Sequence, residues 1–95
     1  MIRIKWSGPA RMDLARIEDF FATTDPEFAV RASDAAFASA EFLLEQPRAG
    51  PALGHRLLRK WKVRGTPLLL IYQIETDGIA MVRVQHDRSD WQSLP

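Results

Sequence analysis

The chain has 95 residues and a formal net charge of +1, and 46% of its residues are hydrophobic while 26% are charged. This length fits a single domain, residues 1–95, with one core and no room for a separate cofactor domain, and the composition is that of a folded globular protein. The absence of cysteine excludes disulfides and thiolate metal sites, and two histidines far apart in the sequence do not suggest a metal site.

The first predicted element is a strand over residues 2–6, where Ile2, Ile4 and Trp6 alternate with two basic residues. An alternation of this period is typical of a strand with one buried side. Ser7 fits the N-cap of a helix that runs from Ala10 to about Ala22. The apolar side of this helix holds Leu14, Ile17 and Phe21, and its other side holds Asp13, Arg16, Glu18 and Asp19.

A second helix is predicted from Pro26 to about Glu45, with Asp25 as its N-cap. Its inner side is rich in alanine and carries a few larger anchors: Ala29, Ala32, Ala35, Ala36 and Ala40, with Phe28, Phe42 and Leu43. Small residues let two helices approach closely, so residues 10–45 are predicted to form an antiparallel helical hairpin. An interface between copies of the chain is the alternative for the alanine stripe.

Three strands are predicted in the second half of the chain. In residues 55–64 one side holds Arg56, Leu58, Lys60, Lys62 and Arg64, and the other holds Leu57, Arg59, Trp61 and Val63. Residues 68–74 are apolar on both sides, and residues 75–78 carry a hairpin signal. The last strand places Ala80, Val82 and Val84 on one side and Ile79, Met81 and Arg83 on the other. The order β-α-α-β-β-β predicts an α+β fold, with a helical hairpin packed on one face of a mostly antiparallel sheet.

The charges are distributed unevenly along this predicted fold. Residues 1–47 hold five basic and eight acidic side chains, whereas residues 48–95 hold eight basic and four acidic ones. A basic half indicates an anionic partner, although a solvated face of mixed charge is the plain alternative. If Trp61, Val63, Val82 and Val84 face the helices, the uncovered sheet face combines cations with an apolar strip: Lys60, Lys62, Arg64 and Arg83 with Leu69, Ile71 and Met81. Such a surface predicts a partner-binding site.

An enzymatic interpretation is also open for this face. A ribonuclease needs a base for the 2′-hydroxyl, cations for the charged transition state and an acid for the leaving oxygen. The side chains available for these roles are Lys60, Lys62, Arg83 and His86. In the alternative interpretation His86 only ends the last strand.

Several sequence motifs resemble the RelE/ParE superfamily of bacterial toxins. They are Trp6-Ser7 followed by Ala10-x-x-Asp13-Leu14-x-x-Ile17, the long second helix ending at Pro47, Leu-Arg-x-Trp at residues 58–61, Leu-x-Tyr at 70–72, and Arg-Val-x-His-x-Arg-x-Asp-Trp at 83–91. The resemblance covers nearly the whole chain, in order. It implies a RelE-like fold and the toxin half of a toxin–antitoxin pair, neutralised by a small ParD-like antitoxin in a hetero-oligomer.

The superfamily resemblance leaves two functional branches. RelE-like members cleave mRNA on the ribosome, often with a C-terminal tyrosine, whereas ParE-like members are associated with poisoning DNA gyrase. Trp91 stands where that tyrosine is expected, and an indole nitrogen can only donate a hydrogen bond. The tail therefore favours a ParE-like, non-enzymatic gyrase inhibitor without cofactor or metal, with a ribosome-dependent mRNA endonuclease as the alternative.

In either branch, one set of residues is expected to bind the target or the antitoxin. It comprises Arg59, Lys60, Lys62, Arg64, Leu69, Ile71, Met81, Arg83, His86, Arg88 and Trp91. The first residues lack the apolar run of a secretory signal, and the longest apolar run, Leu68 to Tyr72, is too short to cross a membrane. We therefore expect a cytoplasmic protein that does not contact a membrane.

Overall fold

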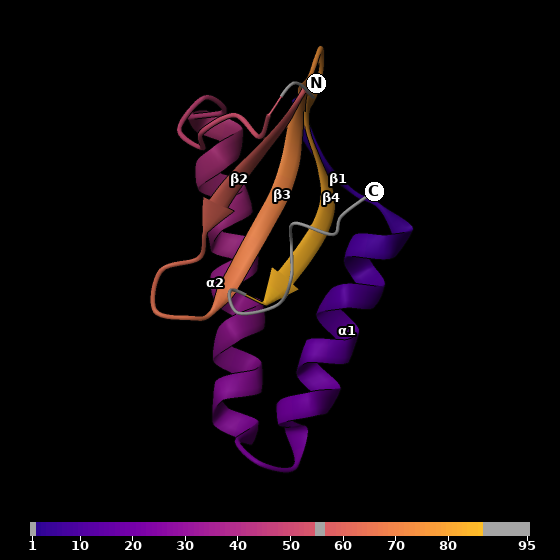
Figure 1. Cartoon of the computed structure of the whole chain (residues 1–95), viewed down its shortest axis with the longest axis vertical. Helices are drawn as coiled ribbons and strands as arrows, with labels where there is room; N and C mark the ends of the chain where they lie inside the picture. Colours follow the sequence, from indigo (N-terminus) through magenta and orange to yellow (C-terminus); the bar gives the residue numbers. More distant parts are fainter. Residues whose placement is uncertain (1, 55–56, 87–95) are drawn as a thin grey trace.

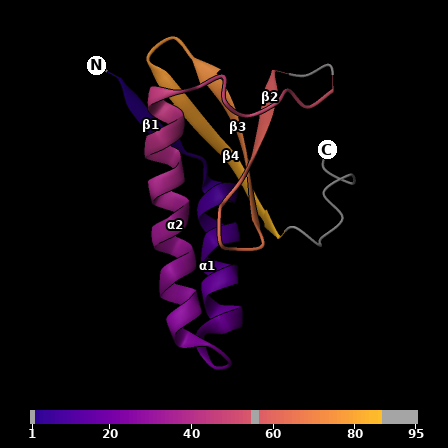
Figure 2. The same cartoon turned by 90° about the vertical axis from the view of Figure 1, so that its left-hand side faces the viewer.

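Six elements follow one another in the predicted order in the computed structural model, which describes residues 2–54 and 57–86. They are β1 (Arg3–Trp6), α1 (Gly8–Ala22), α2 (Pro26–Glu45), β2 (Leu58–Lys62), β3 (Leu68–Glu75) and β4 (Gly78–His86). Figure 1 shows α2 behind the sheet, and Figure 2 shows both helices on the same side of the strands. The predicted α+β fold, with a helical hairpin on one face of the sheet, is confirmed.

The helix boundaries follow from the capping residues that the sequence offers. The Ser7 hydroxyl oxygen accepts from the Ala10 amide at 3.0 Å, and a carboxylate oxygen of Asp25 accepts from the Phe28 amide at 3.1 Å. Both helices carry a proline in the first turn, where its missing amide costs nothing. On α2 the side facing α1 and the sheet buries small residues and one leucine: Ala29, Ala32, Ser33, Ala36, Ala40 and Leu43.

The four strands form one sheet in the order β1-β4-β3-β2. β4 pairs antiparallel with β3, and β3 pairs antiparallel with β2, while β1 pairs parallel with β4. The sheet is therefore mostly antiparallel, as predicted. The first strand of the chain and the last strand are neighbours, and Arg3 lies opposite Gly78.

A β-bulge in β4 changes which side chains reach the core. Met81 lies opposite Tyr72, but Arg83 lies opposite Ile71, so Val82 is an extra residue in β4. An extra residue resets the alternation of a strand. Ile79 and Met81, before the bulge, therefore face the helices together with Val84, after it, and all three are buried. The prediction that Ile79 and Met81 face away from the helices is wrong for this reason.

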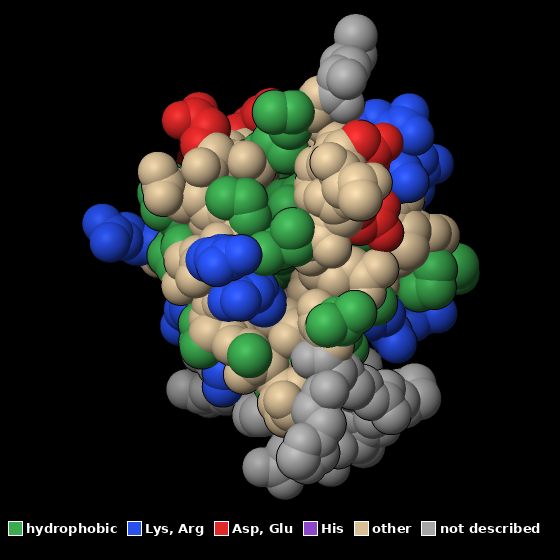
Figure 3. Space-filling model, turned by 90° about the horizontal axis from the view of Figure 1, so that it is seen from above, with side chains coloured by type: hydrophobic (Ala, Val, Ile, Leu, Met, Phe, Trp, Pro, Cys, Tyr) green, Lys and Arg blue, Asp and Glu red, His purple; other side chains and the backbone are tan. Residues whose placement is uncertain are grey.

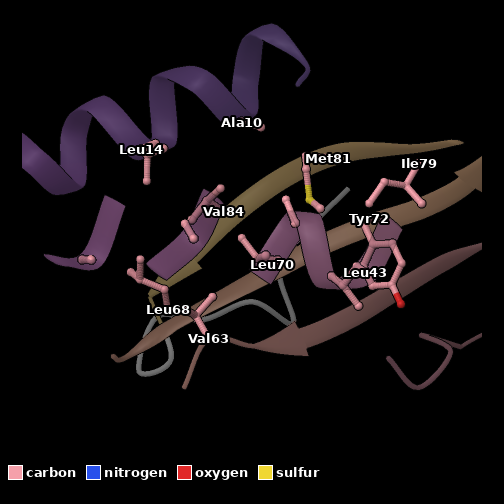
Figure 4. Packing of buried hydrophobic residues seen from close by; sticks show 13 residues of the cluster. Ala10, Leu14, Leu43, Val63, Leu68, Leu70, Tyr72, Ile79, Met81 and Val84 are labelled. Carbon is pink, nitrogen blue, oxygen red and sulfur yellow. The ribbon is translucent and has the colours of Figure 1, made fainter. Parts of the chain in front are cut away.

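The core lies between the helical hairpin and this face of the sheet. Figure 4 shows side chains from α1, α2, the sheet and the segment after β2 meeting there. The fully buried members of this core with the largest side chains are Tyr72, Leu43, Leu68, Leu70, Ile79, Met81 and Val63. Ile71 is also fully buried, but it does not belong to this core. Burial of these apolar side chains is the main favourable term in the stability of such a fold.

Tyr72 anchors the loop that follows α2. Its hydroxyl donates to the Pro47 carbonyl at 2.6 Å and accepts from the Gly50 amide at 3.0 Å. A Cβ on Gly50 would overlap the Lys60 carbonyl oxygen and lie 2.7 Å from the tyrosine hydroxyl, so this approach requires glycine. Arg59 donates from Nη1 to the Gly50 carbonyl at 2.7 Å. The loop is therefore fixed from both sides.

Burial raises the pKa of Tyr72 above 10.0, although the hydrogen bond from Gly50 and the charge of Arg59 oppose this shift. A raised pKa means that the folded chain keeps the phenol proton to a higher pH than the unfolded chain does. The stabilising contribution is complete below the unfolded pKa and is lost as pH rises through the folded value. We therefore expect the free energy of unfolding in urea to fall above about pH 10.

Tyr72 is the only tyrosine of the chain, so tyrosinate absorbance reports on this group alone. The absorbance should rise at a higher pH in the folded chain than in urea. A Tyr72→Phe variant is the control for the pH dependence of stability, because it lacks only the phenol hydroxyl and keeps every other side chain. Coincident titration curves for the folded and unfolded chains would contradict this account.

Candidate functional site

The sheet face that points away from the helices, called the far face below, carries the predicted cations. Across the three antiparallel strands, Lys60 lies opposite Ile71 and Ile71 opposite Arg83, while Lys62 lies opposite Leu69 and Leu69 opposite Gln85. Residues directly opposite one another on neighbouring strands share a face. The pairing therefore confirms that Lys60, Lys62 and Arg83 belong to the same face of the sheet.

The apolar strip expected beside these cations does not form as predicted. Leu69 and Ile71 lie on the far face, but they are only 8% and 0% exposed. Met81 is 0% exposed and belongs to the core on the opposite face, because of the bulge. The prediction of an exposed apolar surface made of these three residues is wrong.

Arg83 is held by a carboxylate of α1. Its Nε donates to Asp13 Oδ2 at 2.7 Å and its Nη2 donates to Asp13 Oδ1 at 2.9 Å. Asp13 Oδ2 also accepts from the Val84 amide at 2.9 Å. The hydrogen bonds to Asp13 raise the pKa of Arg83, and burial opposes them. The arginine within an apolar strand is therefore explained first by an ion pair inside the molecule.

Asp13 has a role that its place in the sequence did not predict. It was predicted on the polar side of the first helix, but it is 7% exposed. The available signal was its position beside Ala10, Leu14 and Ile17, since residues three and four apart lie on one helix face. A carboxylate in the buried stripe of a helix requires a cation or several donors, and Arg83 and Val84 supply them.

Some backbone groups of β2, and of the part of β4 that extends past β1, are paired with other segments of the chain. Beyond β1, the Ser7 amide donates to the Met81 carbonyl at 3.0 Å, the Ser7 hydroxyl donates to the Val82 carbonyl at 2.8 Å, and Asp13 binds the Val84 amide. On β2, the Lys60 amide donates to the Pro51 carbonyl and the Leu58 carbonyl accepts from the Leu53 amide. Because these backbone groups already have hydrogen-bond partners, a partner protein cannot add a strand to the sheet at these positions.

A depression with cationic and apolar walls lies beside β2. Its walls are formed by Pro51, Lys60, Trp61, Lys62, Arg64, Gly65 and Leu69. The ring of Trp61 stacks on that of Phe42 from α2, with a centroid distance of 5.3 Å, which fixes one wall. A surface of this kind suits an acidic group attached to an apolar one, as in a protein segment.

The remaining predicted site residues lie elsewhere. His86 is opposite Leu68, a core residue, so its side chain belongs to the helix-covered face and not to the far face. The four residues proposed for RNA cleavage are therefore divided between two faces. Arg59 lies opposite Tyr72, also on the helix side, and holds the loop after α2. Arg88 and Trp91 lie outside the described residues.

Two searches of the described residues bear on other kinds of site. Residues 2–54 and 57–86 contain no group of three or more His, Asp or Glu side chains placed to hold a metal ion. In the same part of the chain, no helix has the length and hydropathy needed to span a bilayer.

The chain is similar to one protein family and to solved structures. The model of the family described as "ParE toxin of type II toxin-antitoxin system, parDE" matches residues 4–91. A solved structure described as "Chromosomal ParDE TA system from P. aeruginosa" superposes with a TM-score of 0.78 at 21% sequence identity, over 90% of this chain and 96% of that one. At this identity the second match is a likeness of fold. No curated protein matches the chain.

Proposed function

Because this chain belongs to the family of ParE toxins of type II toxin–antitoxin systems, we propose that it inhibits DNA gyrase without being an enzyme and that a ParD-like antitoxin neutralises it. The observation that carries the non-enzymatic part is the separation of the candidate ribonuclease residues. By strand pairing, Lys60 and Lys62 share the far face, whereas His86 belongs to the helix side. In addition, Arg83 is already bound to Asp13. Since gyrase acts on chromosomal DNA, this function places the toxin in the cytoplasm.

The depression beside β2 is the surface that we propose for the antitoxin. Lys60, Lys62 and Arg64 give it positive charge, and Trp61 and Leu69 give it apolar walls. An antitoxin segment with acidic residues around an apolar side chain would complement both features. The paired backbone groups of β2 and β4 favour contact through side chains rather than strand addition at those positions.

The proposed function is tested by inducing the chain alone in bacteria and by assaying the purified protein. We expect growth arrest in the cells and inhibition of gyrase supercoiling by the purified protein. We also expect mRNA in a translating extract to remain intact. In-frame mRNA cleavage with normal supercoiling would support the ribosome-dependent endonuclease instead. A chain that affects neither gyrase nor mRNA would overturn both functions.

The antitoxin surface is tested with Lys60→Glu combined with Lys62→Glu. Reversing both charges should slow association with the antitoxin by about tenfold at low salt and flatten the salt dependence of the association rate, because opposite charges steer the encounter. Arg11→Glu combined with Arg16→Glu is the matched control, since both arginines are exposed on α1 and the change in net charge is equal. Equal effects of the two double variants would refute this placement.

A further inference from the structure

A second exposed surface lies at the end of the molecule where α2 ends and β3 turns into β4. Ile74 and Leu57 are 41% and 86% exposed there. Two hollows meet at Ile74, one lined also by Gln46, Pro47, Arg48 and Ala49, the other by Ala52, Leu57, Leu58 and Arg59. We call the apolar part of this surface the end patch: Pro47, Ala49, Ala52, Leu57 and Ile74. Ile74 lies on the same side of β3 as the core residues Leu70 and Tyr72, but it extends past the last turn of α2.

Charge around the end patch has one sign within the two hollows. One hollow contains Arg48 and the other contains Arg59, and no described residue lining either of them is acidic. Figure 3, which looks onto this end, shows hydrophobic side chains in the middle, Lys or Arg side chains next to them and Asp or Glu side chains farther out. The patch therefore suits an apolar group that carries a carboxylate nearby.

The walls of both hollows are held in place before any partner arrives. Tyr72 fixes Pro47 and Gly50, and Arg59 donates to the Gly50 carbonyl at 2.7 Å and the Arg48 carbonyl at 3.4 Å. A preformed surface spends little conformational entropy when it binds, so even a small contact contributes to affinity.

Two other occupants fit less well. A symmetric pair of chains would place the patch against itself and bring the arginines of one copy towards those of the other, which is repulsive. Nucleic acid needs several cations along its phosphates, whereas one of the two arginines here already donates to backbone carbonyls and most of the lining is apolar. An acidic protein segment is the occupant that matches both properties.

We propose that the end patch binds an apolar side chain of the antitoxin, flanked by an acidic residue that reaches Arg48. This inference rests on the proposed antitoxin partner, and it adds a second contact at the opposite end of β2 from the cationic depression. Ile74 is the ridge between the two hollows, and its side chain is the expected centre of the contact.

The test measures binding of the purified toxin chain to the antitoxin that restores growth on co-expression. Ile74→Asp is expected to raise the Kd at least about tenfold, as loss of a central apolar anchor does. Arg48→Glu should raise it several-fold, and this exposed loop position is not expected to affect folding. Val30→Asp and Arg11→Glu are the matched controls, because Val30 is 63% exposed and both residues lie on helices outside the patch.

Circular dichroism identifies any Ile74→Asp protein that fails to fold, and Arg48→Glu then decides the question. Wild-type affinity in Arg48→Glu and in a folded Ile74→Asp would overturn the inference. The inference would also be overturned if either variant lost binding to a duplex DNA oligonucleotide and kept its affinity for the antitoxin, because the patch would then bind nucleic acid. Binding to the antitoxin is measured on purified proteins and does not depend on gyrase. Failure of the chain to inhibit gyrase would therefore overturn the proposed function, but the affinities of the variants would still test the end patch.

Discussion

Replacing Asp13 with alanine is expected to lower the free energy of unfolding by about 2–4 kcal/mol, because a largely buried ion pair and its hydrogen bonds are broken on one side only. The substitution leaves the guanidinium of Arg83 without its bidentate partner and the Val84 amide without an acceptor. The loss should lie towards the lower end of this range, because the Arg83 side chain is 30% exposed and solvent screens its charge. Urea denaturation of the two proteins gives the difference directly.

The appropriate control is Asp19→Ala on the same helix. Asp19 is exposed, so its loss should change stability by no more than about 0.5 kcal/mol. A double-mutant cycle with Arg83→Met then isolates the pair. Because the double variant contains no uncompensated charge, it should be less destabilised than the sum of the single variants. Strict additivity would show that Asp13 and Arg83 do not stabilise each other.

Gly78→Ala is expected to destabilise the chain by about 3 kcal/mol or more, through a strained backbone and a steric clash together. The φ angle of Gly78 is 145°, and a Cβ there would overlap the carbonyl oxygen of Arg3. Since Arg3 belongs to β1, the strand would have to move away from β4 to make room. A thermal melt should therefore show a midpoint lower by well over 10 °C, at about 4–8 °C for each kcal/mol.

Gly65→Ala separates the two causes. The φ angle of Gly65 is 78°, and an added Cβ at this position meets nothing within 4 Å. Only backbone strain remains, at about 1–2 kcal/mol. If Gly78→Ala destabilised the chain no more than Gly65→Ala, the close approach of β1 would not be the reason for glycine at this position.

Local signals were sufficient for the helices and for most of the sheet. Ser7 and Asp25 mark the helix starts because a cap acts within three residues, and the alanines of α2 mark its inner side because helix period is a local property. The alternation in β2 likewise placed Lys60 and Lys62 on the face opposite to Trp61. These predictions needed no knowledge of distant parts of the chain.

The errors came from interactions between distant residues. The bulge at Val82 depends on how β4 is matched to β3, and nothing in residues 79–84 alone breaks the alternation. Arg83 looked like a surface cation because its partner, Asp13, is 70 positions away in the sequence. Arg59 was assigned to the correct side of β2, but its attachment to Gly50 depends on the path of the loop.

The pairing of β1 with β4 has a consequence for how the chain folds during synthesis. Within this domain β1 is the first strand and its neighbour β4 is the last, so β1 has no partner in the sheet until the residues between them and β4 itself have been made. The ion pair between Asp13 and Arg83 likewise cannot form until Arg83 has been made, 70 positions later in the sequence. Contacts between residues far apart in the sequence slow folding, because a long loop must close before they form. The sheet can therefore be completed only after β4 has been made.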